Sequence, residues 1–139
     1  MKWTVRELKK GDMIRVKLGN VYHYGVFLSE EEVVAFGYPP LPEFQNKQEE
    51  VSVLSTDIDV FACGCPVEAP LYTLKEKLAK NSPDKTEKLA RSRIGETGYN
   101  LIHNNCEHFA YEAVFNKHYS EQEETVRKQW EKYARSAIR

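Results

Sequence analysis

The feature that most constrains the fold of this chain is a change in the spacing of its apolar residues near the middle of the sequence. In the first half, short apolar segments alternate with polar residues and end at turn signals such as Gly19-Asn20, a pattern typical of antiparallel strands. In the second half, apolar residues recur every three or four positions, which is typical of amphipathic helices. Strands followed by helices predict an α+β fold.

The predicted strands lie in the first half of the chain. Turn residues separate three consecutive strand-like segments, which should form a meander, and the proline-rich stretch over 37–50 predicts an irregular loop. A fourth strand should follow this loop, and after it a short strand or a buried turn. In chain order these segments are Met13–Leu18, Val21–Leu28, Val33–Phe36, Val51–Ser55 and Val60–Cys63.

Capping signals mark the predicted helices. Ser82-Pro83 should begin a helix that ends at a left-handed Gly95, because serine caps a helix and proline fits its first position. Ser120 and Glu123 form a capping-box pair that should begin a helix over 120–138. Its apolar residues share one face, so we expect this C-terminal amphipathic helix to dock on the body; they are Val126, Trp130, Tyr133, Ala134 and Ala137.

The composition predicts one globular domain over residues 1–139, because 41% of the residues are apolar and 29% are charged. The net charge of −1 gives no basic surface for nucleic acid. No apolar run approaches the roughly 18 residues of a membrane span, and the N-terminus lacks the apolar core of a signal peptide. We therefore expect a cytoplasmic protein without a transmembrane segment.

The three cysteines argue against a disulfide framework and against a structural zinc site. Their number is odd, and the positions of Cys63, Cys65 and Cys106 do not give the paired spacing typical of zinc ligands. We interpret Cys63 and Cys65 as small buried side chains, with oxidation or a soft metal as the alternative. The sequence predicts no metal and no cofactor.

Cys106 is the strongest candidate nucleophile. Asn105 is a good helix cap, and the apolar residues that follow place Cys106 in the first turn of a helix. Unpaired N–H groups and the positive end of the helix dipole stabilise an anion there, so we expect the pKa of this thiol to fall to roughly 3.5–7.5. The alternative is a small buried residue at a helix start.

His23 is a candidate general base, because an imidazole within an apolar strand needs a partner. A structural histidine is the alternative. His103, His108 and His118 are weaker candidates, since His108 lies about 200° around the helix from Cys106. His103 and His108 also lack the i, i+4 spacing of a helical metal motif.

The segment Asn105-Cys106-Glu107-His108-Phe109 resembles the signature of lecithin:retinol-acyltransferase-like (LRAT-like) proteins, within the NlpC-type thiol hydrolase superfamily. Gly11-Asp12-Met13-Ile14 and His23-Tyr24-Gly25-Val26-Phe27 are similar to the family's N-terminal strands, and the match runs from about 11 to 115. The resemblance implies a circularly permuted papain-like fold, in which a small antiparallel sheet carries the histidine and packs against the nucleophile helix. It also implies Cys106 as nucleophile and His23 as general base, with the acyl group held as a thioester on Cys106 before it passes to water or an amine.

One departure from the family pattern concerns the residue that orients the base. The family carries a histidine or another polar residue where this chain has Ala35. Tyr38, Asn46, Gln48 or a backbone carbonyl could replace it, and Tyr22, Tyr38 and Asn105 are candidate orienting or oxyanion residues.

Three functions follow. The first is a cysteine acyl hydrolase or acyltransferase acting on an acyl ester or amide. The second is a thiol peptidase or amidase, and the third is a non-catalytic binding or regulatory module that lost its orienting residue. Peripheral membrane contact through the last helix is a further expectation, with an ordinary solvated face as the alternative; its basic residues are Arg127, Lys128, Lys132, Arg135 and Arg139.

Overall fold

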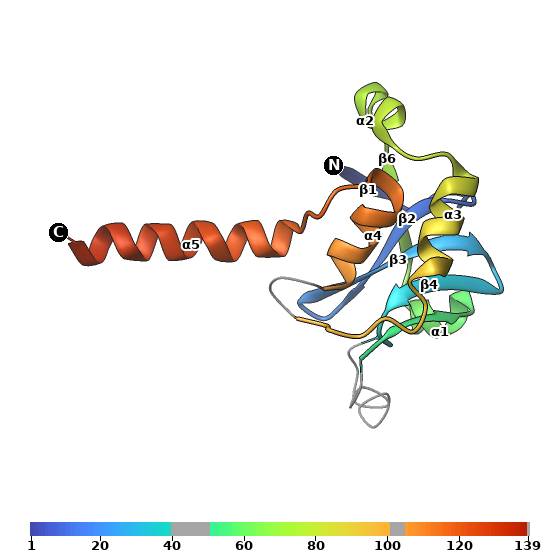
Figure 1. Ribbon diagram of the computed structural model, residues 1–139, viewed down its shortest axis with the longest axis horizontal. Coiled ribbons are helices and arrows are strands. Elements are labelled where there is room, and N and C mark those ends of the chain that lie inside the picture. Colours follow the sequence, from blue (N-terminus) through green and yellow to red (C-terminus); the bar gives the residue numbers. More distant parts are fainter. Residues whose placement is uncertain (40–50, 101–104, 139) are drawn as a thin grey trace.

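A twisted antiparallel sheet with helices against both faces forms the body of the protein (Figure 1). The computed structural model describes residues 1–39, 51–100 and 105–138. Within these residues the sheet has six strands, in the order β1-β6-β2-β3-β4-β5. They are β1 (Lys2–Thr4), β2 (Asp12–Leu18), β3 (Val21–Ser29), β4 (Glu32–Phe36), β5 (Val53–Thr56) and β6 (Val67–Leu71).

The predicted meander is confirmed as β2, β3 and β4. Each strand pairs with the next in antiparallel register, with Val16 opposite His23 and Val26 opposite Val34. Because strand side chains alternate, each strand supplies two hydrophobic layers. Tyr24 and Val26 belong to the layer that packs against α4 (Cys106–Phe115), whereas the second layer lies on the opposite face; its members include Ile14, Val16, Phe27, Val33, Ala35 and Phe61.

The helices are α1 (Ile58–Ala62), α2 (Leu74–Ala79), α3 (Pro83–Ser92), α4 (Cys106–Phe115) and α5 (Glu121–Ile138). The predicted starts at Pro83, Cys106 and Glu121 agree with the structure. Gly95 has the expected positive φ, at +93°. The expectation of a short strand or buried turn over Val60–Cys63 is wrong, because most of this segment belongs to α1. The Asp57 carboxylate accepts the Val60 N–H at 2.8 Å and caps the start of this helix.

Helix α4 covers the centre of the sheet. Phe109, Ala110, Ala113 and Val114 are fully buried or nearly so, and they pack in the layer that contains Tyr24 and Val26. This packing places the first residue of α4, Cys106, over the beginning of β3.

Helix α5 forms as expected. The expectation that its apolar face packs against the body is wrong for the part of the helix that the structure describes. The helix extends away from the sheet (Figure 1), and Trp130 and Tyr133 are 66% and 68% exposed. The physical reason is that α3 and α4 already fill the sheet face on that side, through Ala90 and Phe109. None of the described helices is long and apolar enough to cross a bilayer.

Candidate active site

Cys106 and His23 line the same cavity, which has a volume of about 140 Å³. The cavity lies where β3 begins and β4 ends, beside the start of α4. Its remaining lining residues are Val21, Tyr22, Phe36, Gly37, Tyr38, Val51, Tyr99 and Gln122. The structure therefore brings the two residues expected to carry the chemistry to one mostly apolar cavity.

The Cys106 thiol is buried and protonated at neutral pH. Burial raises its pKa from 9.0 to about 11. Hydrogen bonds to the sulfur from the backbone of Tyr24, Cys106 and Glu107 act in the opposite direction, but burial outweighs them. The expectation that the helix start lowers the pKa of Cys106 is therefore wrong for the resting protein. Burial removes the water that would solvate a thiolate, and this outweighs the stabilising effect of the helix start.

Alkylation of the three cysteines should report this burial directly. A rise in pKa from 9.0 to about 11 lowers the thiolate fraction at pH 8 by about a hundredfold. We expect iodoacetamide to modify Cys106 far more slowly at pH 8 than the half-buried Cys63 and Cys65, with a Cys106 rate that rises up to about pH 11. Peptide mass spectrometry would measure each rate, and fast Cys106 labelling below pH 8 would contradict the expectation.

His23 is held in a neutral state on β3. Its imidazole is buried, and its centroid lies 5.0 Å from that of Phe61. Burial lowers the pKa of His23 from 6.5 to about 4, and a hydrogen bond to the backbone of Gly37 only partly opposes this. Its Nε2 is buried and makes no hydrogen bond to the described residues, which leaves Nδ1 as the donor to Gly37. The Nε2 lone pair is therefore available to accept a proton at pH 7.

A hydrogen bond to the Gly37 backbone holds the His23 ring at the point where the family pattern has a polar side chain in place of Ala35. Ala35 lies in the apolar layer with Phe61, as its side chain requires. Of the alternatives considered, a backbone carbonyl is the one found on His23, two residues beyond Ala35. Asn46 and Gln48, the other substitutes, lie outside the described residues, as does His103.

Cys106 and His23 are not joined by a hydrogen bond in the part of the chain that the structure describes. The reason lies in the strand alternation. Cys106 packs in the layer of Tyr24 and Val26, whereas His23 points to the side of Phe61. Both residues reach the cavity at the beginning of β3, but the resting site holds a separate thiol and imidazole.

The other predicted site residues have distinct surroundings. Tyr22 and Tyr38 line the cavity, and the Arg15 guanidinium lies 4.0 Å from the Tyr22 ring centroid. Asn105 is the helix cap, and its Oδ1 accepts the N–H groups of Glu107 and His108 at 2.9 and 3.0 Å. The side chain of Asn105 is therefore occupied in ordering the turn that carries Cys106.

A buried polar link beneath this turn was not foreseen from the sequence. The Ser120 hydroxyl donates to Glu107 Oε1 at 2.8 Å and accepts from Asn105 Nδ2 at 3.3 Å. Glu107 also accepts the Gln122 N–H at 3.3 Å. Ser120 was expected only as a cap, and the capping contact is present at 3.2 Å to Glu123 N. The link fastens the start of α5 to the first turn of α4.

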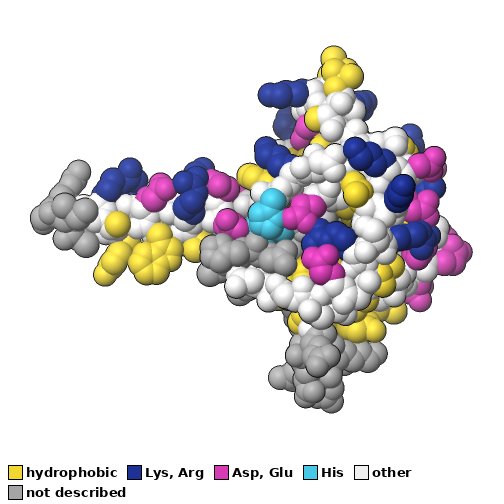
Figure 2. Space-filling view, in the orientation of Figure 1, with side chains coloured by type: hydrophobic (Ala, Val, Ile, Leu, Met, Phe, Trp, Pro, Cys, Tyr) yellow, Lys and Arg dark blue, Asp and Glu magenta, His cyan; other side chains and the backbone are white. Residues whose placement is uncertain are grey.

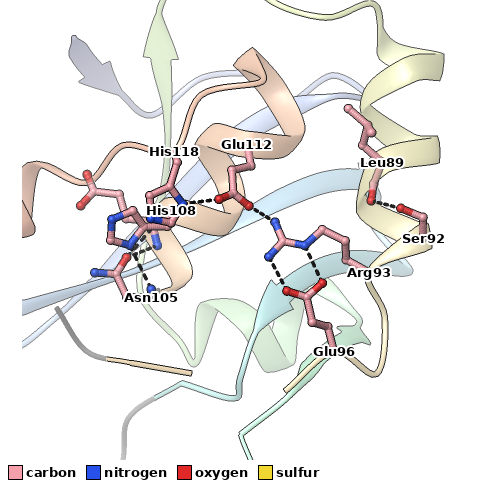
Figure 3. A network of polar contacts seen from close by, with 9 residues as sticks. Leu89, Ser92, Arg93, Glu96, Asn105, His108, Glu112 and His118 are labelled. Carbon is pink, nitrogen blue, oxygen red and sulfur yellow. Dashed lines mark hydrogen bonds and ion pairs between the residues drawn. The ribbon is translucent and has the colours of Figure 1, made fainter. Parts of the chain in front are cut away.

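Next to this link, two stacked histidines continue a polar network towards α3 (Figure 3). The rings of His108 and His118 lie 4.2 Å apart, His118 contacts Glu112, and Glu112 contacts Arg93. His108 Nε2 lies 2.7 Å from Glu123 Oε2. Sequence spacing could not find this network, because its residues come from α4, α5, the segment between them and the end of α3.

His108, His118 and Glu123 are metal-ligand types, with ligand atoms within 4.8 Å of one another. However, His108 Nδ1 accepts the Asn105 N–H at 3.0 Å, which in a neutral imidazole puts the proton on Nε2. A metal at Nε2 would need the lone pair of that same atom. The contacts of His108 thus fit a helix-capping role better than metal ligation, with Nε2 beside the Glu123 carboxylate.

Most of the chain matches one known protein family. The family model described as lecithin retinol acyltransferase matches residues 6–119. Lecithin retinol acyltransferase of Mus musculus is 25% identical to this chain over an alignment of 142 positions that covers 88% of the chain. The alignment covers 61% of the mouse protein, so this chain spans less than two thirds of that relative.

Proposed function

We propose that this chain, which belongs to the lecithin retinol acyltransferase family, is a cysteine-dependent acyl hydrolase or acyltransferase. The carrying observation is that Cys106, at the start of α4, and the neutral imidazole of His23 line one cavity. A nucleophile and a base at one cavity are the minimum for covalent acyl transfer.

The two pKa shifts determine the form of the proposed mechanism. Because burial keeps the Cys106 thiol protonated and His23 neutral, the resting site is not a thiolate–imidazolium pair. His23 would act as a general base at the moment of attack. The two side chains must approach to hydrogen-bond distance when substrate enters, and catalytic hydrogen bonds of this kind commonly form only in the complex.

The proposed cycle has two halves. Sγ of Cys106 forms a bond to the carbonyl carbon while its proton passes to Nε2 of His23. The bond to the leaving group then breaks, and His23 returns the proton to the departing oxygen or nitrogen. This leaves a thioester on Cys106, which water or an amine attacks in the second half with His23 again accepting and returning the proton. Tyr22 and Tyr38 are proposed to contact the carbonyl oxygen during these steps.

An acyl ester with an apolar chain is the proposed substrate class. Phe36, Val51 and Tyr99 give the cavity apolar walls beside the thiol, which suits an acyl chain. The mouse relative is named for a transfer from lecithin to retinol, and that name supports a lipid ester here as well. Amide substrates would use the same two residues. An ester probe and an amide probe with the same acyl chain would therefore distinguish an esterase or acyltransferase from a peptidase or amidase, by which of the two probes the protein cleaves.

The test is trapping of the acyl-enzyme. After incubation with a p-nitrophenyl acyl ester and an acid quench, intact-mass spectrometry should show one added acyl group. We expect this group on Cys106, released by hydroxylamine, absent from Cys106→Ala and still present in the matched Cys65→Ala control. Equal acylation of Cys106→Ala and wild type would refute the proposal.

A non-catalytic binding module is the second candidate, favoured by the protonated thiol and by the lack of a hydrogen bond between Cys106 and His23. This function predicts no acyl adduct with any ester or amide. It also predicts that Cys106→Ala and His23→Ala bind an apolar ligand as wild type does.

A further inference from the structure

The outer part of α5 carries an apolar stripe that the body does not cover. Val126, Trp130 and Tyr133 share one face of the helix, and the two aromatic rings pack edge to face with centroids 6.0 Å apart. Figure 2 shows apolar side chains along one edge of α5 and charged side chains along the other. An exposed stripe with a charged opposite face indicates a surface that meets a partner.

This apolar stripe begins at the candidate active site. Gln122 lines the cavity of Cys106 and lies four residues before Val126, so the two side chains share a helix face. Ser120 and Glu107 fasten this end of α5 to the first turn of α4. A partner on the stripe is therefore held next to the cavity opening.

The charge around the stripe is basic. From Arg127 to Arg135 the helix has four basic residues and one acidic residue, Glu131. Arg127 and Lys132 lie about 100° and 120° to either side of Val126, so they flank the stripe. Arg127 is ion-paired with Glu124 and Glu131, so the net basic charge of this part of the helix comes from Lys128, Lys132 and Arg135. The other acidic residues lie in the first turn near the body, where Glu123 contacts His108. An anionic partner fits this arrangement.

The stripe is too small for a stable contact with a second copy of the chain. Aromatic side chains bury about 150–250 Å² each, so Trp130, Tyr133 and Val126 provide about 500 Å² together. Stable protein interfaces bury about 800 Å² per partner. A lipid surface has no such threshold, and Trp and Tyr favour its headgroup region.

We propose that α5 binds in the headgroup region of an anionic lipid surface and thereby holds the opening of the Cys106 cavity against that surface. The part that concerns the cavity depends on the proposed function, because it makes the surface the source of the acyl substrate. Binding itself needs only the stripe and the flanking basic residues, as in interfacial amphipathic helices.

Vesicle co-sedimentation tests the binding. We expect the full chain to pellet with vesicles of phosphatidylcholine and phosphatidylglycerol, and at least about tenfold less with phosphatidylcholine alone or in high salt. The double variant Trp130→Gln, Tyr133→Gln should lose this binding. The matched variant Glu124→Gln, Glu131→Gln changes the opposite face and should keep it.

Trp130 gives a second measurement. In a Trp3→Phe background it is the remaining tryptophan of the two in the chain, so its emission should shift to the blue when anionic vesicles are added. Absence of vesicle binding, or equal binding by the Trp130→Gln, Tyr133→Gln variant, would overturn the proposal. A dimer in sedimentation velocity that this variant loses, without vesicle binding, would overturn it in favour of a second copy.

The two proposals fail separately. Vesicle binding by a chain that never forms an acyl adduct on Cys106 would refute the enzymatic function and leave the lipid surface standing. Acylation of Cys106 by a short soluble ester, without vesicle binding, would refute the lipid surface and leave the enzymatic function standing.

Discussion

Replacing Phe109 with alanine is expected to lower the free energy of unfolding by about 3–5 kcal/mol, the largest effect of a single substitution that we predict. The Phe109 ring is fully buried between α4 and the sheet, and the Arg93 guanidinium lies 5.0 Å from its centroid. Truncation would remove this apolar area and leave a cavity under α4. Urea unfolding followed by circular dichroism measures the change.

Phe115 provides the matched control for this substitution. It lies at the end of the same helix, is only partly buried and packs at the edge of the same layer. Phe115→Ala should therefore cost clearly less than Phe109→Ala. Equal losses for the two variants would mean that α4 is not held by its central contact with the sheet.

Acidification should destabilise the protein through His23, in the second large effect that we predict. Burial lowers the pKa of His23 from 6.5 to about 4, so between these values the unfolded chain binds a proton that the folded chain does not. Stability therefore falls as the pH drops below 6.5, by about 3 kcal/mol once the pH reaches about 4. At pH 5 the loss relative to pH 7 should be about 2 kcal/mol.

Unfolding of His23→Leu at pH 7 and pH 5 tests this assignment. The variant lacks the titrating ring, so the difference between its two free energies of unfolding should be about 2 kcal/mol smaller than in wild type. His118→Leu, at a half-exposed ring, should keep most of the difference. The assignment is wrong if His23→Leu keeps it as well.

Local patterns were sufficient to predict the meander, the start of α4 and its cap. Alternation in Val21–Leu28 depends on a sheet with two buried faces, and the structure has both. The Asn105 cap depends on contacts within three residues, which a sequence displays directly. Predictions of this kind succeed because their causes lie within a few residues of each other.

Features set by distant parts of the chain could not be predicted in this way. The helix dipole at Cys106 is visible in the sequence, but the burial that raises the pKa of the thiol depends on the whole fold. The partner of His23 is the backbone of Gly37, and a backbone carbonyl has no sequence signature. The stripe on α5 indicated that the helix needs a partner without indicating which one.

The attachment of α5 to α4 has a mechanical consequence. Helix α5 has 18 residues and is therefore about 27 Å long, and its near end is hydrogen-bonded through Ser120 to Glu107 and Asn105. It is a lever whose fulcrum lies under the turn that carries Cys106. A load applied near Tyr133 therefore acts as torque on the turn that holds the thiol.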